Sequence, residues 1–443
     1  MTRSILFSVI EYKYVYTLYV IKHSAAFLVA HEIWPVAIAI GVGIIYPAWL
    51  PYAVLIALLF WPLRWLVKGR PSVRTPIDIP VLVLMLMVPV TLWATALPQR
   101  TLPQVTRLVA GIFLFYALIN WTDTRGRLRT MLDAFVLLTI LLALIAPFGV
   151  EWLTTKYPLL PIGLFERLPL LLSDPANPNV MAGFLIILLP IAYAFLLFTW
   201  RDLSVIEKLL SLLAVLTATV MLVMTQSRGA WLAFLLATGV LVALRWRKAW
   251  ILYLIGILIA TLASLYFGAG MLLKGFAGEG QLLSLEGRLE VWSRALYMIQ
   301  DFSLTGAGMG LFMDVTDLLY PFFLFRPGTI EHAHNLYLQV AVDLGLPGLV
   351  AWLAVLGGMT YTAWRLYLAG RRNDDRLVSG LGAGLFCSQI ALIIHGLTDA
   401  VTWGMVRPAP LVWAIWGAVG AGSLLFLVPV NRPQQTGEPL ENT

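Results

Sequence analysis

The feature that most constrains this chain is a series of twelve apolar runs, most of them close to 20 residues long. A helix needs about 20 apolar residues to cross the hydrocarbon core of a bilayer. Only helices and closed barrels satisfy their backbone hydrogen bonds inside lipid. The sequence therefore predicts an all-α, polytopic membrane protein of about twelve transmembrane helices. The predicted spans are 27–46, 50–67, 79–97, 103–120, 130–148, 180–200, 207–225, 229–244, 249–268, 336–364, 378–402 and 408–430.

Composition excludes a soluble protein. Of the 443 residues, 60% are hydrophobic and 12% are charged, against about 45–50% and about 25% in soluble domains. The net charge of +7 is not the mark of a nucleic-acid-binding protein, because the basic residues form short clusters between apolar runs and no aromatic-laced basic face. The single Cys387 lies inside an apolar run, so no disulfide framework is expected.

The basic clusters predict the orientation. Loops rich in Lys and Arg face the cytoplasm, and here such loops alternate with loops that are poor in both. With twelve spans, both termini are then cytoplasmic. The clusters are Lys68, Arg70 and Arg74; Arg125, Arg127 and Arg129; Arg201 and Lys208; Arg245, Arg247 and Lys248; and Arg365, Arg371, Arg372 and Arg376.

This orientation divides the chain into five parts. They are a cytoplasmic N-terminal segment (1–26), nine spans (27–268), a large outer loop (269–335), three spans (336–430) and a cytoplasmic tail (431–443). In the large loop, apolar residues recur at helical spacing and predict an amphipathic helix on the bilayer surface; they are Leu289, Trp292, Leu296 and Ile299. Gly306, Gly308 and Gly310 then predict an irregular turn. A second outer loop, 149–179, is rich in proline.

Several polar residues gather on the predicted outer side. His332 and His334 lie where the large loop re-enters the membrane, and His395 and Asp399 share one helix face because they are four residues apart. Arg228 lies in an outer hairpin, and Arg288 opens the amphipathic helix.

A histidine and two arginines at an outer membrane surface suit transfer of a sugar chain from a lipid diphosphate. Guanidinium groups bind phosphate oxygens bidentately and stay charged. They would hold the diphosphate and stabilise the charge that develops as it leaves. A histidine, with an unperturbed pKa of about 6.5, can take a proton from an acceptor hydroxyl near neutrality. Arginines supply this charge without a metal, and the sequence shows no carboxylate cluster that would hold one.

Four sequence elements together resemble the O-antigen ligase and O-antigen polymerase superfamily. His334-Asn335, nine residues and Gly345-Leu-Pro-Gly348 are similar to the H-N-x9-G-x-x-G signature of bacterial O-antigen ligases. Thr225-Gln-Ser-Arg228-Gly-Ala-Trp231 resembles the arginine-bearing segment of the superfamily. The third element is Arg288 followed by Trp292 and then by Leu304-Thr-Gly306-Ala-Gly308. The fourth is Asn177-Pro-Asn179.

The resemblance covers about residues 175–400 and implies a bacterial inner-membrane glycosyltransferase whose active site is periplasmic. It would move a glycan from an undecaprenyl-diphosphate carrier to a hydroxyl of lipid A–core, with inversion and without metal or other cofactor. It implies that His334 is the catalytic histidine and that Arg228 and Arg288 bind the donor diphosphate. The residues expected to bind substrate are His332, Asn335, Asn177, Asn179, His395 and Asp399.

Each of these residues has a structural alternative. His334 would cap the tenth span, His332 would be a solvent-facing loop residue, and the two would start a metal site only if further ligands lay nearby. Arg228 and Arg288 would contact lipid headgroups. His395 and Asp399 would form a hydrogen-bonded pair inside the membrane, and Asn177 and Asn179 would shape a turn.

Two functional alternatives also stand. The first is an O-antigen or exopolysaccharide polymerase, which would use a second lipid-linked glycan as acceptor. The second is a transporter, because twelve spans with both termini inside is a common transporter layout. A transporter predicts paired repeats and charges at mid-membrane, whereas the distinctive polar residues here gather on one face. Membrane lipids are the other expected partners, and nucleic acid is not expected.

Overall fold

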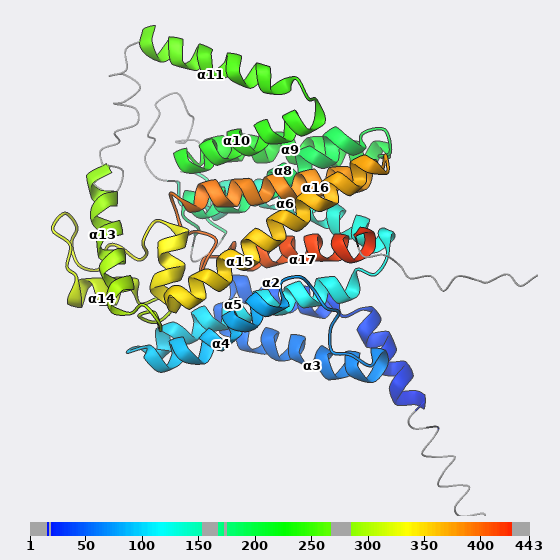
Figure 1. Cartoon of the computed structure of the whole chain (residues 1–443), viewed down its shortest axis with the longest axis horizontal. Coiled ribbons are helices and arrows are strands. Elements are labelled where there is room, and N and C mark those ends of the chain that lie inside the picture. Colours follow the sequence, from blue (N-terminus) through cyan, green and yellow to red (C-terminus); the bar gives the residue numbers. More distant parts are fainter. Residues whose placement is uncertain (1–15, 17–18, 153–166, 172–174, 267–284, 428–443) are drawn as a thin grey trace, which may run out of the picture.

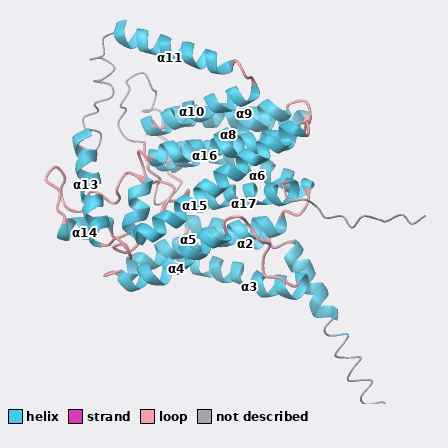
Figure 2. Cartoon of the chain, in the orientation of Figure 1, coloured by secondary structure: helices cyan, strands magenta, loops and turns pink. Residues whose placement is uncertain are grey.

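A computed structural model describes residues 16, 19–152, 167–171, 175–266 and 285–427. Helices and connecting loops make up this part of the chain, with no strand in it, and two short segments meet in one isolated bridge between Val150 and Ala176 (Figure 2). The predicted all-α class is confirmed for these residues. The predicted cytoplasmic tail and most of the N-terminal segment lie outside them, as do parts of both outer loops.

The first half of the chain supplies helices that are mostly long and apolar. A helix over Tyr19–Ala30 bends by 53° into the next one. The helices that follow are α2 (Ile33–Ile45), the short 3₁₀ helix η1 (Pro47–Trp49), α3 (Leu50–Lys68), α4 (Asp78–Ala94), α5 (Pro98–Trp121), α6 (Arg125–Gly149) and α8 (Pro178–Thr199).

The second half adds further membrane helices and a helical region in the predicted outer loop. Its helices are α9 (Val205–Met224), α10 (Arg228–Arg245), α11 (Ala249–Tyr266), α13 (Leu285–Asp301), α14 (Phe312–Leu319), α15 (Leu336–Arg372), α16 (Arg376–Gly396) and α17 (Ala409–Phe426).

Helix α16 is the centre of the bundle and packs against α8, α10 and α15 (Figure 1). Small residues on α16 let its neighbours approach closely, as they do in many membrane helix pairs. A Cβ added at Gly382 would lie 2.1 Å from the backbone nitrogen of Tyr367 on α15, and one at Gly384 would lie 2.8 Å from the Cβ of Ala194 on α8. Helix α11 lies apart, at the edge of the bundle.

Each of the twelve predicted spans coincides with a helix. Nine of the described helices are long and apolar enough to cross a membrane, or ten if the bent pair Tyr19–Ala30 and Ile33–Ile45 counts as one span. The remaining two predicted spans correspond to α4, a shorter apolar helix, and to α11. A multi-pass membrane protein is therefore established, and the count of twelve stays a prediction.

The outer loop forms a small hydrophobic core of its own. Val291, Ala295 and Met298 of α13 are fully buried there, against Phe312 of α14 and Val342 of α15, among others. A helix is thus present where the amphipathic helix was predicted, and two members of its predicted stripe, Trp292 and Ile299, pack against this core. The other two members, Leu289 and Leu296, are about half exposed, and they point away from this core.

Helix α15 is broken at Gly345, which has φ 69° and ψ −178°. The break lets the chain press against the outer loop: a Cβ at Gly345 would lie 2.8 Å from the carbonyl oxygen of Ser303. On the facing segment, Gly306 (φ 71°) lies close to α15: a Cβ at Gly306 would be 2.5 Å from the backbone of Asp343. The predicted tenth span, 336–364, therefore has a short first part, and its second part continues to Arg372.

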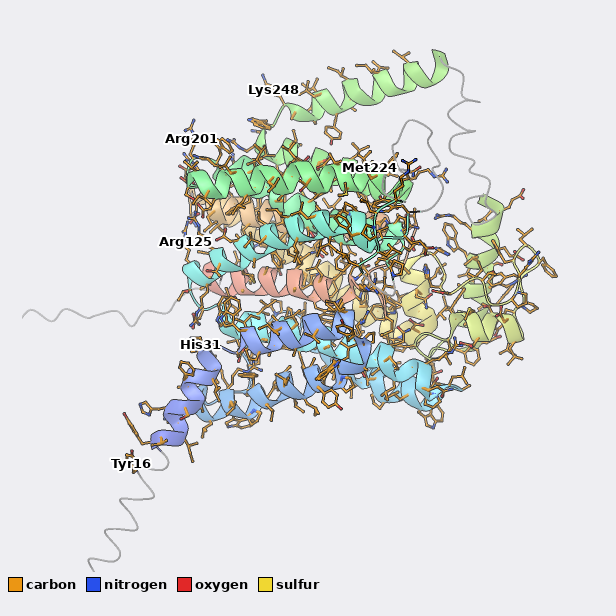
Figure 3. All side chains as sticks on the ribbon, turned by 180° about the vertical axis from the view of Figure 1, so that it is seen from behind. Tyr16, His31, Arg125, Arg201, Met224 and Lys248 are labelled. Carbon is orange, nitrogen blue, oxygen red and sulfur yellow. The ribbon has the colours of Figure 1, made fainter. Side chains whose placement is uncertain are left out.

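The two ends of the bundle carry different side chains. Figure 3 shows Arg125 and Arg201 at one end and Met224 at the other. Ion pairs at the arginine end join α6, α9, α16 and the loops beside them; they are Arg125–Asp375, Arg129–Glu207 and Arg376–Asp202. The outer loop, with α13 and α14, lies at the opposite end.

Replacing Gly345 by alanine should destabilise the protein. This combination of φ and ψ is essentially confined to glycine and costs an alanine about 1–3 kcal/mol, and the contact with Ser303 adds to that cost. Thermal unfolding in detergent would measure it, with Gly357→Ala in the same helix as the control, because no atom lies within 4 Å of a Cβ there. Equal melting temperatures for the two variants would contradict the packing role of Gly345.

Candidate active site

The site is built around the loop that follows α16. The sequence predicted a span over 378–402, but α16 ends at Gly396. The reason is a tightened last turn: the N–H groups of Leu397 and Thr398 bond back to carbonyls only three residues earlier, and Asp399 then caps the turn by accepting the N–H of Ala400 at 2.8 Å. Asp399 thereby leaves the helix.

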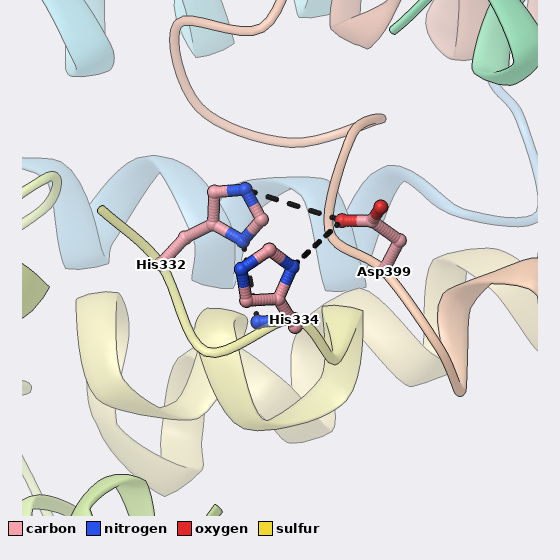
Figure 4. A group of neighbouring side chains, drawn as sticks. All are labelled: His332, His334 and Asp399. Carbon is pink, nitrogen blue, oxygen red and sulfur yellow. Dashed lines mark hydrogen bonds and ion pairs between the residues drawn. The ribbon is translucent and has the colours of Figure 1, made fainter. Parts of the chain in front are cut away.

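The Asp399 carboxylate lies beside two neighbouring imidazoles (Figure 4). Its Oδ1 is 3.5 Å from Nδ1 of His334 and 3.9 Å from Nε2 of His332. The two rings are themselves 4.2 Å apart between centroids. The side chain of Asp399 is 7% exposed, whereas His334 and His332 keep 21% and 25% exposure. Both histidine side chains are thus partly exposed to solvent, and both lie close to the buried carboxylate of Asp399.

The backbone of His334 is in the left-handed region, with φ 46°. Such a conformation is uncommon outside glycine, asparagine, aspartate and histidine, and it gathers at functional sites. Two contacts hold it: its N–H donates to Nδ1 of His332 at 3.2 Å, and the next residue, Asn335, caps α15 by accepting the N–H groups of Tyr337 and Leu338. The Asn335 amide also donates to the carbonyl of Leu397.

The two predicted arginines meet at the same loop. Arg288 Nη1, from α13, donates to the carbonyl of Thr398 at 2.9 Å. Arg228 begins α10, where the neighbouring Gly229 has so little space that a Cβ would lie 2.2 Å from the Thr398 hydroxyl. Three elements that are distant in the sequence therefore converge on residues 397–399.

Charges in the site act on one another. Burial would raise the pKa of Asp399, but the hydrogen bond from His334 and the neighbouring imidazoles lower it below its usual range. Burial and the charge of His334 lower the pKa of His332 to about 4, although the charge of Asp399 acts to raise it. The pKa of Arg288 is lowered by burial and by the charge of Arg228, and Asp399 opposes this. Asp399 is therefore ionised and His332 is neutral near pH 7.

The other predicted residues lie around this group at different distances. His395 is 2% exposed on α16, and its charge interacts with that of Asp399. Asn177 caps α8, accepts the N–H of Asn179 at 2.9 Å, and lines a cavity together with His332. Asn179 thus lies in the first turn of α8, while Asn177 both caps this helix and borders the cavity.

This arrangement has two chemical possibilities. An ionised Asp399 favours the tautomer of His334 with its proton on Nδ1, which leaves Nε2 free to accept a proton. Alternatively, ligand atoms of His332, His334 and Asp399 all lie within 4.8 Å of one another, which is close enough for a metal ion. The sequence offered no third ligand beside the two histidines, and the structure supplies Asp399.

Comparison with known families fits the position of these residues. Residues 212–353 match the model of the family described as O-antigen ligase. This part of the chain is similar to the O-antigen ligase family. The comparison with curated proteins found no match. The family indicates a function of the lipid-linked glycan ligase or polymerase kind, and the resemblance found from the sequence is confirmed.

The O-antigen ligase match covers only part of the site. It contains both arginines, both histidines and Asn335, whereas Asp399 and His395 lie beyond it. Sequence reasoning also missed Arg107 and Asp343, which are both 1% exposed inside membrane helices and close to the site. An ionisable residue within a span is costly and usually functional, and that signal would have found both.

The low pKa of His332 predicts a pH-dependent stability. The folded protein binds fewer protons at His332 than the unfolded chain does between about pH 4 and 6.5, so this contribution is complete above pH 6.5 and is lost as the pH falls toward 4. The melting temperature of the His332→Gln variant should therefore fall less between pH 7 and 4.5 than that of the parent. Parallel curves for the two proteins would show that His332 is not buried as a neutral ring.

Proposed function

We propose that this protein is an inverting glycosyltransferase of the O-antigen ligase type. It transfers a glycan from an undecaprenyl-diphosphate carrier to a hydroxyl of lipid A–core, at the periplasmic face of the bacterial inner membrane. One observation carries the proposal: the three separate elements that carry Arg228, Arg288 and His334 converge on residues 397–399, where the contact of the first element is made by Gly229, next to Arg228. A polar group of this composition fits a donor diphosphate beside an acceptor hydroxyl.

His334 is the general base in this proposal. Nε2 takes the proton of the acceptor hydroxyl while its oxygen attacks the anomeric carbon of the donor sugar. The bond from that carbon to the phosphate oxygen breaks, and the electron pair leaves with the lipid diphosphate. Asp399, 3.5 Å from Nδ1, orients the ring and stabilises the imidazolium that forms. A positioned base of this kind contributes about 10²–10⁴ in rate.

Arg228 and Arg288 bind the leaving diphosphate. Because the charge of each acts on the other, a dianionic group between them relieves their repulsion. Fork-shaped donors bind phosphate oxygens in pairs, and the growing charge on the leaving oxygen strengthens these bonds in the transition state. Arg288 is preorganised for this role by its bond to the Thr398 carbonyl.

In this proposal the reaction needs no metal. The arginine pair already supplies positive charge where the diphosphate leaves, and His334 must keep a ring nitrogen free to act as the base. The His332–His334–Asp399 group could hold an ion, and an ion bound there would occupy the histidine that the reaction needs. The two uses of this group are therefore exclusive, and a chelator separates them.

A polymerase and a transporter remain the alternatives to be tested. The O-antigen ligase match favours glycan transfer over transport. A polymerase would use the same donor site and differ in its acceptor. An assay that offers lipid A–core and a second lipid-linked glycan in separate reactions decides between ligase and polymerase.

Substitution of the three site residues should reduce transfer without unfolding the protein. His334→Ala should lower the turnover number by about 10²–10⁴, because the base is lost. Arg228→Gln and Arg288→Gln should each lower it by about 10²–10³, because each removes a charge-assisted contact to the leaving group. Purified protein, lipid-linked donor and lipid A–core acceptor in detergent, with product separated on a gel, would measure this.

Two controls accompany these variants. His31→Ala removes a histidine at the opposite end of the bundle (Figure 3) and should leave transfer unchanged. EDTA should also leave the parent enzyme unchanged. Full activity of folded His334→Ala would refute the base, and loss of activity in EDTA that Zn²⁺ or Mg²⁺ restores would refute the metal-independent reaction.

The orientation of the site can be tested with single cysteines. The arginine-rich end should face the cytoplasm by the positive-inside rule, so Leu318 of α14 should be periplasmic and Asn373 cytoplasmic. Leu318 is 80% exposed, Asn373 is also exposed, and the native Cys387 is fully buried, which keeps its background low. A membrane-impermeant maleimide should label Leu318→Cys in intact spheroplasts, and Asn373→Cys only after lysis. The reverse pattern would place the site on the cytoplasmic side.

A further inference from the structure

A cavity of about 650 Å³ adjoins the proposed catalytic histidines. This volume lies within the range of about 300–1,000 Å³ that ligand pockets occupy. His332 and Asn177 border the cavity, whereas Arg228 and Arg288 do not line it. One loop relates the two regions: its residues 397–399 contact Arg288 and the two histidines, and its residues 400 and 403–407 form a wall of the cavity.

The walls near His332 have the side chains that bind sugar hydroxyls. The carboxylate of Asp343 accepts from Trp403 Nε1 at 2.7 Å and from Gln339 at 3.0 Å, so these groups are fixed in place. Gln104 extends between two glycines at positive φ: a Cβ at Gly310 or at Gly404 would lie 2.6 Å from its amide atoms. Fixed amides and carboxylates beside an indole ring match the mixed donors, acceptors and apolar faces of a sugar.

Another part of the wall is cationic. Arg407 lines the cavity, and its charge acts on Arg107 of α5. The Arg107 side chain is almost fully buried and donates to the carbonyl of Met405, which is next to Trp403–Gly404 in the wall. Its Nε and Nη2 atoms have no hydrogen-bond partner among the described residues. A buried guanidinium with two unmade bonds is costly, and a second cation beside it raises that cost.

We propose that this cavity is the acceptor site and that Arg407, with the field of Arg107 behind it, binds an anionic substituent of the acceptor glycan. This inference rests on the proposed transferase function and adds the class of acceptor that the enzyme prefers: a sugar carrying a phosphate or a carboxylate. The carboxylates and amides near His332 bind the hydroxyls of that sugar. The attacking hydroxyl of the sugar passes His332 to reach His334. Arg228 and Arg288 bind the donor diphosphate.

Kinetics of the Arg407→Gln variant test the site. The variant should raise the KM for lipid A–core about 10- to 100-fold, the effect of losing one charge-assisted hydrogen bond, while the KM for the lipid-linked donor stays unchanged. Arg326→Gln is the control, because it removes an exposed arginine that lies between α14 and α15 and does not border the cavity. A raised donor KM, or an unchanged acceptor KM, would overturn the acceptor site.

The chemistry of the anion is identified by changing the acceptor. With phosphatase-treated lipid A–core, the parent should itself show the raised KM, and Arg407→Gln should raise it no further, if the anion is a phosphate. Carboxyl-reduced acceptor should give this result if the anion is a carboxylate. If Arg407→Gln still raises the KM of both treated acceptors by the same factor, Arg407 does not bind an anion and the inference fails.

Stability of the Arg107→Met variant provides an independent test. If Arg107 is present to support a ligand, its replacement should leave the melting temperature equal or higher, because a buried charge with unmade bonds is removed, and should raise the acceptor KM. An arginine with a purely structural role would instead lower the melting temperature and leave KM unchanged. Loss of transfer in His334→Ala together with normal acceptor KM in both arginine variants would keep the proposed function and reject the acceptor site.

Discussion

The carboxylate of Asp343 is the interaction on which the site depends. It is buried and accepts hydrogen bonds from the Gly310 N–H, from Gln339 and from Trp403, while the backbone carbonyl of the same residue accepts from Thr91 of α4. A buried polar group is tolerated only when such bonds are made. These four bonds tie together the glycine turn of the outer loop, the start of α15, the loop after α16 and α4. The histidines and the carboxylate of the site face one another because those parts are fixed.

Much of the fold follows from local signals in the sequence. Apolar length found every helix of the bundle, and the hairpin at Arg228 fell where it was predicted, because lipid forces a chain of this composition into helices. The ends and breaks of the helices were harder to predict from the sequence. The break at Gly345 lies within a run that is apolar on both sides. The glycines and proline of Gly345-Leu-Pro-Gly348 were the only local signal of a bend. The stripe of α13 that packs inward was only partly predicted, since Trp292 and Ile299 contact the core while Leu289 and Leu296 are exposed. The helix has apolar residues on two faces, and tertiary contacts decide between them.

The site was partly predictable, for a different reason. A family signature named His334, Arg228 and Arg288, and their convergence required only that three loops lie on one side of the membrane. The meeting of Asp399 with His334 was not predictable, since the two are 65 positions apart and no local pattern relates them. Asp343 and Arg107 were overlooked inside predicted spans, although an ionisable side chain in a span is itself a signal. Which cavity such a residue serves is known only from the packing of helices.

The left-handed backbone of His334 restricts which amino acids this position can hold. Lysine, glutamate and tyrosine could each exchange a proton, but their side chains are disfavoured at a φ of 46°. Asparagine fits the backbone and cannot act as a base. Histidine combines tolerance of this conformation with a ring nitrogen that can accept a proton. At this position the backbone conformation and the need for a base favour the same side chain. A substitution here therefore meets two independent constraints.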